Sequence, residues 1–340
     1  MKKEALYGKT LDELKSITSV LGFPGYTAKQ IAEWLYKKDA TDIDMMSNLS
    51  KEARALLNEK YEVGLTPHHS FQESTDGTKK YLFHVAAGKY IESAYIPERE
   101  RATLCVSSQV GCKMDCAFCM TGKQGFQGQL TSGEILNQIR SLPEYKKLTN
   151  VVYMGMGEPL DNLDEVLKSL EILTADWGYA WSPKRITVST IGIIPALKRF
   201  LEESKVHLAI SMHTPFDAER LSLMPVQKTY PIERVIEVVR NYDFGRQRRI
   251  SFEYIMFKDL NDTPAHIKGL TKLLQGLRCR INLIRFHPIP GFEHKSPSTK
   301  TMNWFRDTLT SKGITTTIRA SRGEDIFAAC GMLSTDRQNT

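Results

Sequence analysis

Residues Cys105–Gly125, CVSSQVGCKMDCAFCMTGKQG, hold four of the chain's six cysteines. Three of them, Cys112, Cys116 and Cys119, are spaced as C-x3-C-x2-C in one short loop. A structural zinc site normally takes four protein ligands, and no further Cys or His follows at a pairing distance. Three thiolates can instead hold a [4Fe–4S] cluster and leave one iron open to bind another molecule. The loop therefore predicts an open iron–sulfur cluster.

This cysteine spacing resembles the signature of radical S-adenosylmethionine (SAM) enzymes. Phe118, immediately before the last cysteine, suits a cluster that needs an apolar wall against water and oxygen. The alternative from a different class is a non-catalytic RNA-binding protein with a structural zinc ion in this loop. A brown protein with iron and acid-labile sulfide would indicate the cluster, whereas a colourless protein with zinc would indicate the alternative.

The length of 340 residues suggests a large α/β core with an appendage. No stretch approaches the roughly 18 consecutive apolar residues of a membrane span. The charged start, MKKEALYGKTLDELK, lacks the apolar segment of a signal peptide. Clustered, unevenly spaced cysteines indicate metal or redox chemistry in a reducing compartment. We therefore expect a cytoplasmic protein without a membrane segment.

The formal net charge of +7 permits nucleic-acid binding but does not establish it. Clustered cations recur late in the chain, at Lys198–Arg199, Arg246, Arg248–Arg249, Arg278, Arg280, Arg319 and Arg322. A solvated surface explains these cations as well as an RNA-binding surface does.

Residues 1–65 are predicted to form a small helical domain. Thr10 and Glu13 form a capping box ahead of the first helix, and Thr27 repeats this signal ahead of the second. Ser50 is the expected cap of a third helix. The domain could contact RNA or serve only as a packing cap. Residues 66–98 alternate like strands, with runs at Tyr81–Val85 and Tyr90–Ile96 around a turn at Ala87-Gly88.

Residues 99–334 repeat a pattern of strand, turn and helix. The expected strands are Thr103–Ser107, Asn150–Met154, Arg185–Ser189, Val206–Ser211, Ile250–Met256, Arg280–Phe286 and a final Ile314–Arg319. Helices are expected between them, for example Thr131–Ser141, Leu163–Leu173 and Ile232–Asn241. Such β/α units form a parallel sheet with both faces covered, either open or curled into a barrel. Residues 335–340 are a tail.

In such folds the active site lies at the carboxyl ends of the strands. Glycines and polar residues gather at these ends, beside the cluster loop. They are Gly157, Glu158, Ser189, Ser211, Met212, His213 and His287. Beside an open iron, the Gly157 backbone and Glu158 suit the amino group of SAM, hydroxyl groups suit its ribose, and an imidazole suits its adenine. Gly155-x-Gly157 lacks the third glycine of a dinucleotide fingerprint.

Residues 90–331 closely resemble the RlmN/Cfr family of radical SAM RNA methyltransferases. The matching segments are YIPERERATLCVSSQVGCKMDCAFC, TNVVYMGMGEPL, STIGIIPALK, SMHTP, INLIRFHPIPG and RGEDIFAACG. GYTAKQIAEWLY also resembles the N-terminal domain of that family. The resemblance implies a partial (β/α)6 barrel, preceded by the helical domain and a short β-extension.

The resemblance also assigns roles to residues. Cys112, Cys116 and Cys119 would hold the cluster, and the strand-end residues above would bind SAM. Cys330 matches the cysteine that becomes S-methylated, and Cys105 matches the cysteine that resolves the intermediate. Glu92 matches the acidic residue assigned as proton acceptor, whereas His287 stands where the family usually has Asn. Cys279, inside Leu-Arg-Cys-Arg-Ile, is predicted to be a packing residue.

The implied reaction uses two SAM molecules per turnover. The first methylates Cys330, and a methylene radical made from that S-methyl group then adds to an adenine carbon, giving a protein–RNA thioether. Cys105 attacks the Cys330 sulfur, forms a disulfide and releases the methylated RNA. An electron donor such as flavodoxin or ferredoxin with its reductase would restore cluster and thiols. Nothing in the sequence requires more than a monomer.

Within the family, the methyl group goes to C2 of adenine in RlmN enzymes and to C8 in Cfr-type resistance enzymes. STIGIIPALK, LMPV and INLIR also resemble Cfr, whereas YIPERERATLC, KQGF and SRGEDI favour RlmN. The RlmN interpretation implies methylation of an adenosine in the peptidyl-transferase centre of 23S rRNA and often of the adenosine beside the tRNA anticodon. A radical SAM enzyme for a small molecule is disfavoured by the basic charge and the Cys105/Cys330 pair.

Overall fold

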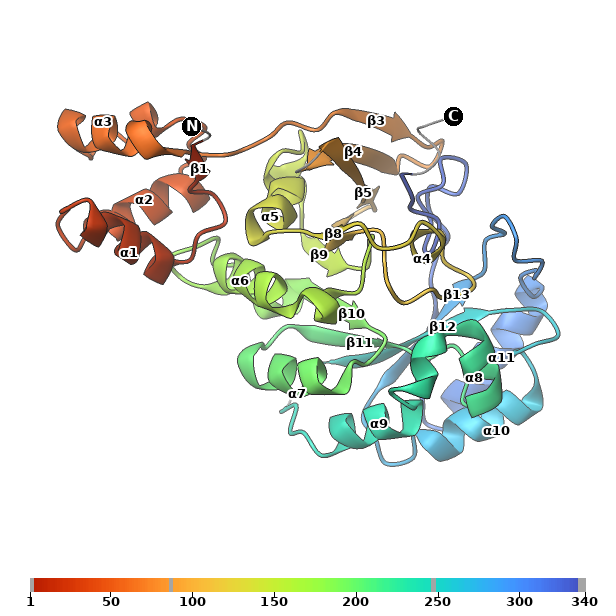
Figure 1. Ribbon diagram of the computed structural model, residues 1–340. Coiled ribbons are helices and arrows are strands. Elements are labelled where there is room, and N and C mark those ends of the chain that lie inside the picture. The colour runs from red at the N-terminus through yellow and green to blue at the C-terminus, as the bar shows by residue number, and fades with distance from the viewer. Residues whose placement is uncertain (1–2, 86–87, 246–248, 336–340) are drawn as a thin grey trace.

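The computed structural model describes residues 3–85, 88–245 and 249–335 of the chain. Its centre is one ten-stranded sheet with the order β14-β13-β12-β11-β10-β9-β6-β5-β4-β3 (Figure 1). The parallel strands are β6 (Ala102–Cys105), β9 (Asn150–Tyr153), β10 (Ile186–Thr190), β11 (His207–Ser211), β12 (Ile250–Met256), β13 (Arg280–Arg285) and β14 (Thr315–Ile318). Each predicted core strand is confirmed to within a few residues. The result is a curved, open α/β sheet with β3 and β14 at its edges.

Three antiparallel strands extend this sheet beyond β6. They are β3 (Ser70–Glu73), β4 (Lys79–Val85) and β5 (Lys89–Pro97). β5 pairs with β6 so that Ala94 lies opposite Cys105. The predicted hairpin is therefore continuous with the core sheet and borders the strand that carries Cys105. Its predicted turn includes Ala87, which lies outside the described residues, as do Arg246 and Arg248.

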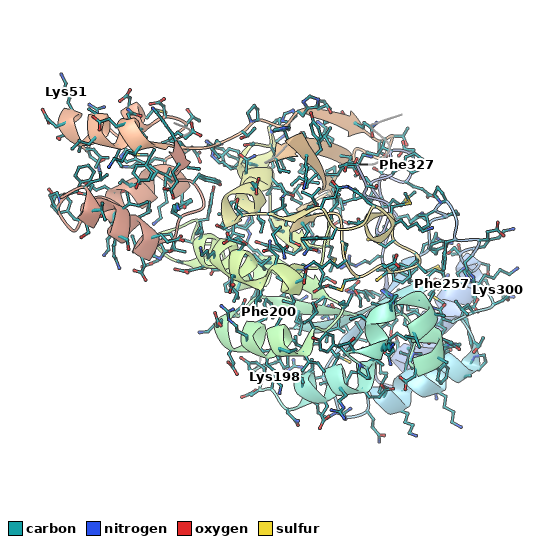
Figure 2. All side chains as sticks on the ribbon, viewed as in Figure 1. Lys51, Lys198, Phe200, Phe257, Lys300 and Phe327 are labelled. Carbon is teal, nitrogen blue, oxygen red and sulfur yellow. The ribbon has the colours of Figure 1, made fainter. Side chains whose placement is uncertain are left out.

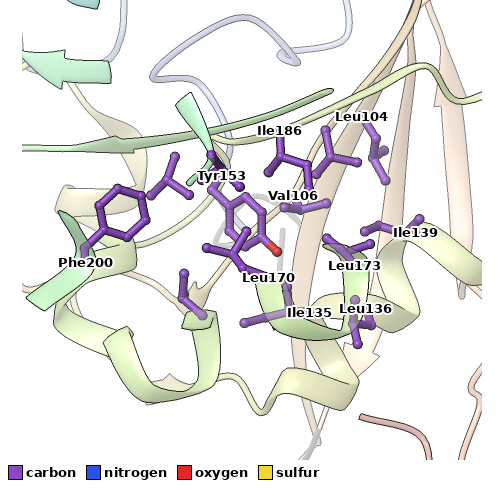
Figure 3. Packing of buried hydrophobic residues seen from close by; sticks show 14 of the residues in the cluster. Leu104, Val106, Ile135, Leu136, Ile139, Tyr153, Leu170, Leu173, Ile186 and Phe200 are labelled. Atoms are coloured by element: carbon purple, nitrogen blue, oxygen red, sulfur yellow. The ribbon is translucent and has the colours of Figure 1, made fainter. Parts of the chain in front are cut away.

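Helices cover the parallel strands. They are α5 (Ser132–Arg140), α6 (Leu163–Thr174), α7 (Ile194–Glu203), α8 (Asp217–Leu223), α9 (Ile232–Arg240), α10 (Pro264–Leu273) and α11 (Thr299–Ser311), with the short α4 (Met120–Lys123) after the cysteine loop. The predicted Thr131–Glu134 capping box is present at the start of α5. The apolar face of α5 packs on the sheet. Ile135 and Leu136 of this helix and Leu104 of β6 are fully buried there (Figure 3). Truncating one such leucine to alanine costs about 2–5 kcal/mol of stability. The contacts between α5 and the sheet therefore stabilise the fold substantially.

The N-terminal domain contains α1 (Leu11–Val20), α2 (Thr27–Tyr36) and α3 (Lys51–Lys60), closed by the short parallel pair β1 (Glu4–Ala5) and β2 (Tyr61–Glu62). The predicted caps at Thr10 and Ser50 are confirmed. The predicted cap at Thr27 is wrong, because Thr27 is already the first helical residue and Tyr26 precedes it without a side-chain hydrogen bond. Buried Thr27 packs inside the domain instead.

This domain is attached to α5 and the segment after α6 by polar contacts. The Tyr7 and Tyr179 hydroxyl groups lie 2.5 Å apart, and the Ser132 hydroxyl donates to the Gly8 carbonyl at 2.9 Å. Arg140 pairs with Asp39 at 3.2 Å. Across the described residues, none of the helices has the length and apolarity needed to span a membrane.

Candidate active site

The predicted cluster cysteines come together in the structure. The loop after β6 passes through the small hairpin of β7 (Gln109–Val110) and β8 (Gly128–Gln129), which holds the loop at both ends. Cys112, Cys116 and Cys119 line one cavity of about 150 Å³ at the carboxyl ends of the strands. The Phe118 ring lies in the wall of this cavity, 4.8 Å from the His213 ring between centroids. The apolar wall predicted from the sequence is therefore present.

The donor set fits a cationic cluster. Burial raises the pKa of Cys112 to about 12. The pKa of Cys116 is also raised, mainly by burial and to a smaller extent by repulsion from Cys119 and Cys112. Thiols in such surroundings ionise only when a cation binds them, as iron would. Nowhere in the described part of the chain do three Cys, His, Asp or Glu side chains converge on a single ion. A cluster does not require that convergence, because each thiolate binds a separate iron.

Glu158 is fixed by hydrogen bonds at the end of β9. Its carboxylate accepts from the Thr190 hydroxyl at 2.5 Å and from the backbone N–H groups of Leu160 and Ile191 at 3.1 Å. Burial raises the pKa of this carboxyl to about 7, although these hydrogen bonds act in the opposite direction. Glu158 lines the cysteine cavity, so it can accept a hydrogen bond from a bound amino group.

Gly157 has to be glycine. Its φ is +99°, and a Cβ atom there would lie 2.5 Å from the Gln109 side chain. The Gln109 side-chain Oε1 in turn accepts the Glu158 backbone N–H at 2.8 Å. Ser189 and Ser211 line the cavity beside Gly157, as predicted. The Met212 side chain is instead fully buried in the main hydrophobic core, so any contact that it makes with a ligand would have to come from its backbone.

His213 lies in the cavity wall as a neutral ring. Its Nδ1 accepts the Ile255 N–H at 3.0 Å, which places the ring proton on Nε2. Burial and the nearby Arg220 lower the His213 pKa to about 3. Its backbone is left-handed with φ +63°, and the Asn261 amide donates to its carbonyl at 2.7 Å. These hydrogen bonds hold the backbone and Nδ1 of this strained residue, so its Nε2–H is the group suited to hydrogen bonding with a base or ribose.

A second cavity of about 470 Å³ adjoins the first. Cys105, Cys330 and His287 line it, together with Arg101, Arg285, Arg319 and Arg322. The two cavities share the wall residues Cys119, Met154, Gly155, Ile284, Cys330 and Gly331. Cys330 is exposed between them, and all six cysteines are free thiols. The predicted SAM ligand His287 lies in this second cavity, where its Nδ1 is 3.2 Å from Glu324 Oε1.

Arg319 supplies positive charge beside both cysteines. Its Nε lies 3.4 Å from Oε2 of Glu253, a buried carboxylate that Ser251 and Asn282 also bind. Burial, and to a smaller extent repulsion from Cys330, raises the pKa of Cys105 to about 12. Desolvation in the cavity wall also raises the Cys330 pKa, while the charge and hydrogen bond of Arg319 act in the opposite direction. Arg319 therefore favours the thiolate of Cys330.

Glu92 is buried rather than exposed. Its Oε1 lies 3.0 Å from the Lys80 ammonium on the neighbouring strand, and its Oε2 accepts the Ser334 backbone N–H at 3.0 Å. Glu92 is not among the described residues that line either cavity. It lies instead behind the C-terminal segment, whose Leu333 forms part of the wall of the second cavity.

Sequence reasoning missed the residues that hold the predicted ones. They are Gln109, Thr190, Arg220, Glu253, Asn261 and Arg319. Arg220 is fully buried and donates to the carbonyl groups of Ile191, Ser211 and Met212, tying the ends of β10 and β11 together. The only available signal was position, since Thr190 directly follows a predicted strand and Glu253 lies on one.

The sequence of this chain is similar to that of known protein families. The family model described as the Radical SAM superfamily matches residues 106–268, and the one described as the ribosomal RNA large subunit methyltransferase N-terminal domain matches residues 5–63. A relative from Parabacteroides distasonis, named a probable dual-specificity RNA methyltransferase RlmN, is 60% identical over 99% of this chain and 98% of its own length. The Syntrophus aciditrophicus relative, named a dual-specificity RNA methyltransferase RlmN, is 43% identical over 96% and 94%.

A solved structure supports the same assignment. The crystal structure of a radical SAM methyltransferase from Sphaerobacter thermophilus matches with a TM-score of 0.90 at 39% identity, covering 97% of this chain and 99% of that chain. An enzyme of this kind uses a [4Fe–4S] cluster and SAM. The chain therefore belongs to the RlmN family of radical SAM RNA methyltransferases.

Proposed function

We propose that the chain methylates C2 of one adenosine in the peptidyl-transferase centre of 23S rRNA and of the adenosine beside the tRNA anticodon, consuming two SAM molecules per turnover. Its relatives bear the RlmN name with the term dual specificity, which favours this assignment over C8 methylation. The observation that carries the proposal is Cys330, which lines both cavities.

Within this proposal, Cys112, Cys116 and Cys119 hold the cluster in the smaller cavity. Gly157, Glu158, Ser189, Ser211 and His213 bind SAM there, because they line the same cavity and their polar groups surround it. His287 lines only the larger cavity, so in this proposal it would face the substrate. When bound, the cluster and SAM supply the methyl group and the one-electron chemistry that activates a methylated thiol.

The two remaining cysteines act in order. Cys330 accepts the methyl group as a thiolate, favoured by Arg319, and carries it into the larger cavity, where a nucleotide of RNA binds. Cys105 lines that cavity too, so its thiolate can attack the Cys330 sulfur and release the product as a disulfide forms. The thiols are then restored by an external electron donor such as flavodoxin or ferredoxin with its reductase.

Glu92 accepts the proton lost from the adenine carbon in this scheme. Because Glu92 lies behind the segment at Ser334, the proton has to pass through an intervening group or that segment has to move. The Lys80 ammonium lies 3.0 Å from this carboxylate and would also compensate its charge.

Nucleoside mass spectrometry tests the proposal. Anaerobically reconstituted protein, SAM, a reductant and unmethylated 23S rRNA or tRNA would be incubated, and the RNA would be digested and compared with 2-methyladenosine and 8-methyladenosine standards. We expect 2-methyladenosine from both RNAs. An 8-methyladenosine signal would overturn the C2 assignment in favour of the Cfr-type alternative, and no signal from one RNA would remove that RNA from the proposal.

A further inference from the structure

The segment that carries Cys330 is held from both sides. Figure 1 shows the C-terminal segment passing between the β3–β4 turn and α4, although these elements are far apart in the sequence. We call the Gly323–Asp325 contacts the first anchor and the Gly331–Thr335 contacts the second anchor. Cys330 lies between the two anchors, and Phe327 on the same stretch has a left-handed backbone with φ +55°.

The first anchor joins this segment to the turn Ser74–Thr78 through reciprocal hydrogen bonds. The Asp325 carboxylate accepts from the Ser74 hydroxyl at 2.6 Å and from the Thr75 N–H at 3.1 Å. In return, the Asp76 carboxylate accepts the Gly323 N–H at 2.9 Å. Each side therefore supplies a carboxylate to the other, which fixes both the position and the orientation of the segment.

The first anchor is also sterically close. Gly323 has φ +62°, and a Cβ atom there would lie 2.8 Å from the Thr78 side chain. Partial burial alone would raise the Asp76 pKa, but hydrogen bonds from Thr78 and Gly323 lower it to about 2. The hydrogen bond from Ser74 also lowers the Asp325 pKa. Both carboxylates are thus ionised acceptors at neutral pH.

The second anchor joins the segment to α4, which begins directly after Cys119. The Met120 N–H donates to the Gly331 carbonyl at 2.8 Å, and the Thr121 hydroxyl donates to the Leu333 carbonyl at 2.7 Å. The Gln124 side chain accepts the Thr335 N–H at 3.1 Å. With both ends tied, Cys330 has a short span over which to move between the two cavities.

We propose that Asp76 and Asp325 are positioning residues that hold Cys330 opposite Cys105, so that the β3–β4 turn sets how readily the two sulfurs meet. This inference rests on the proposed function, in which those two cysteines form a disulfide. Releasing the first anchor would leave the segment tied at one end, and the effective concentration of Cys330 at Cys105 would fall.

Thiol–disulfide exchange without SAM or RNA tests this directly. Anaerobically reconstituted, reduced protein would be treated with oxidised glutathione and quenched with acid. Glutathione disulfide first forms a mixed disulfide at Cys330 and releases one glutathione, and the Cys105 thiolate then displaces the second glutathione. Peptide mass spectrometry gives the ratio of Cys330–glutathione to Cys105–Cys330 disulfide. This ratio reports ring closure and is independent of methyltransferase activity.

We expect a low ratio in the unmodified protein and a ratio about tenfold higher in Asp325→Ala and Asp76→Ala, the estimate corresponding to a tenfold loss of effective concentration. Asp325→Asn keeps one acceptor oxygen and should lie between. Asp243→Ala is the matched control, since Asp243 also accepts a backbone N–H, from Gly245 at 2.8 Å, on an exposed turn away from the site. Ser74→Ala removes two hydrogen bonds of the first anchor, the one donated to Asp325 and the one accepted from the Asp76 N–H, and serves if Asp325→Ala does not fold.

The outcomes separate the two hypotheses. An unchanged ratio in folded Asp325→Ala or Ser74→Ala overturns the positioning role and leaves the proposed function intact. An equal rise in Asp243→Ala also overturns it, because the effect would then be general destabilisation. If the unmodified protein forms no Cys105–Cys330 disulfide, the resolving pair of the proposed function fails, and this inference fails with it.

Discussion

The Met120 backbone N–H donates to the Gly331 carbonyl at 2.8 Å, which ties the residue after Cys119 to the residue after Cys330. The loop that would hold the cluster and the segment that carries Cys330, the proposed methyl acceptor, are therefore joined by a hydrogen bond, although Met120 and Gly331 are 211 positions apart in the sequence. A change that makes the cysteine loop more mobile should therefore also make the segment around Cys330 more mobile.

We predict that loss of the cluster loosens the segment around Cys330. Replacing Cys112, Cys116 and Cys119 together by Ala removes the ligands that fix the loop, and the contacts from α4 to Gly331 and Leu333 then weaken. Hydrogen exchange followed by mass spectrometry should show at least tenfold faster exchange in peptides covering residues 331–335 than in the reconstituted protein. Peptides from β4 are the internal control and should not change.

A second prediction distinguishes the proposed roles of Cys105 and Cys330. Cys105→Ala should leave the enzyme trapped on RNA, because nothing attacks the Cys330 sulfur, whereas Cys330→Ala should form no adduct at all. Denaturing gels of reactions with labelled RNA measure both outcomes. Cys279→Ala is the control, since this half-buried thiol packs against the core and should leave adduct release unchanged. Normal turnover by Cys105→Ala without crosslinked RNA would contradict the assignment of Cys105 as the resolving cysteine.

A third prediction concerns SAM affinity and pH. Since the Glu158 pKa is about 7 in the unliganded protein, the ionised carboxylate that accepts from the amino group of SAM is lost as the pH falls through 7. Affinity should therefore weaken between pH 7 and 6, approaching the tenfold per unit expected for one linked proton. Isothermal titration of reconstituted Glu158→Gln should give weaker binding with little pH dependence in this range. A pH-dependent Gln variant would contradict the role of Glu158.

The parallel strands were predictable because each carries β-branched or apolar residues at buried positions. Phe252 and Leu283, for example, are fully buried on β12 and β13, and such a pattern is recognised without knowledge of the neighbouring strands. The capping box at Thr10 is equally local. Thr27 failed as a cap because a Thr-x-x-Gln pattern can also begin one residue inside a helix, where burial of the side chain decides its place.

The site was predictable only in part, for a physical reason. Cys112, Cys116 and Cys119 carry their signal in their spacing, and Glu158 follows a strand. Arg319 and Glu253 have no such signal in the sequence, because their pairing depends on β12 and β14 lying on either side of β13. Glu92 was singled out only by resemblance to the family, because its partners Lys80 and Ser334 are brought to it by the antiparallel extension and the C-terminal segment.

The last prediction uses the Arg319–Glu253 pair, whose two charges act on Cys330 with opposite sign. Arg319 lowers the Cys330 pKa and Glu253 raises it. Arg319→Gln should therefore raise that pKa, and a shift of one unit means about tenfold less thiolate at a given pH below it. Glu253→Gln should shift the pKa in the other direction, because it removes the repelling carboxylate and leaves the cation.

The pH profile of Cys330 alkylation by iodoacetamide, read from the Cys330 peptide, measures both shifts without SAM or RNA. Arg319→Lys should recover part of the effect of the lost charge. Arg285→Gln is the matched control, because Arg285 lines the same cavity but donates to the Pro297 carbonyl and the Thr299 hydroxyl. Shifts of the same sign in Arg319→Gln and Glu253→Gln would mean that the variants act through a change in packing. Opposite shifts with an unchanged Arg285→Gln profile would establish that this pair sets the ionisation of the Cys330 thiol, the proposed methyl acceptor.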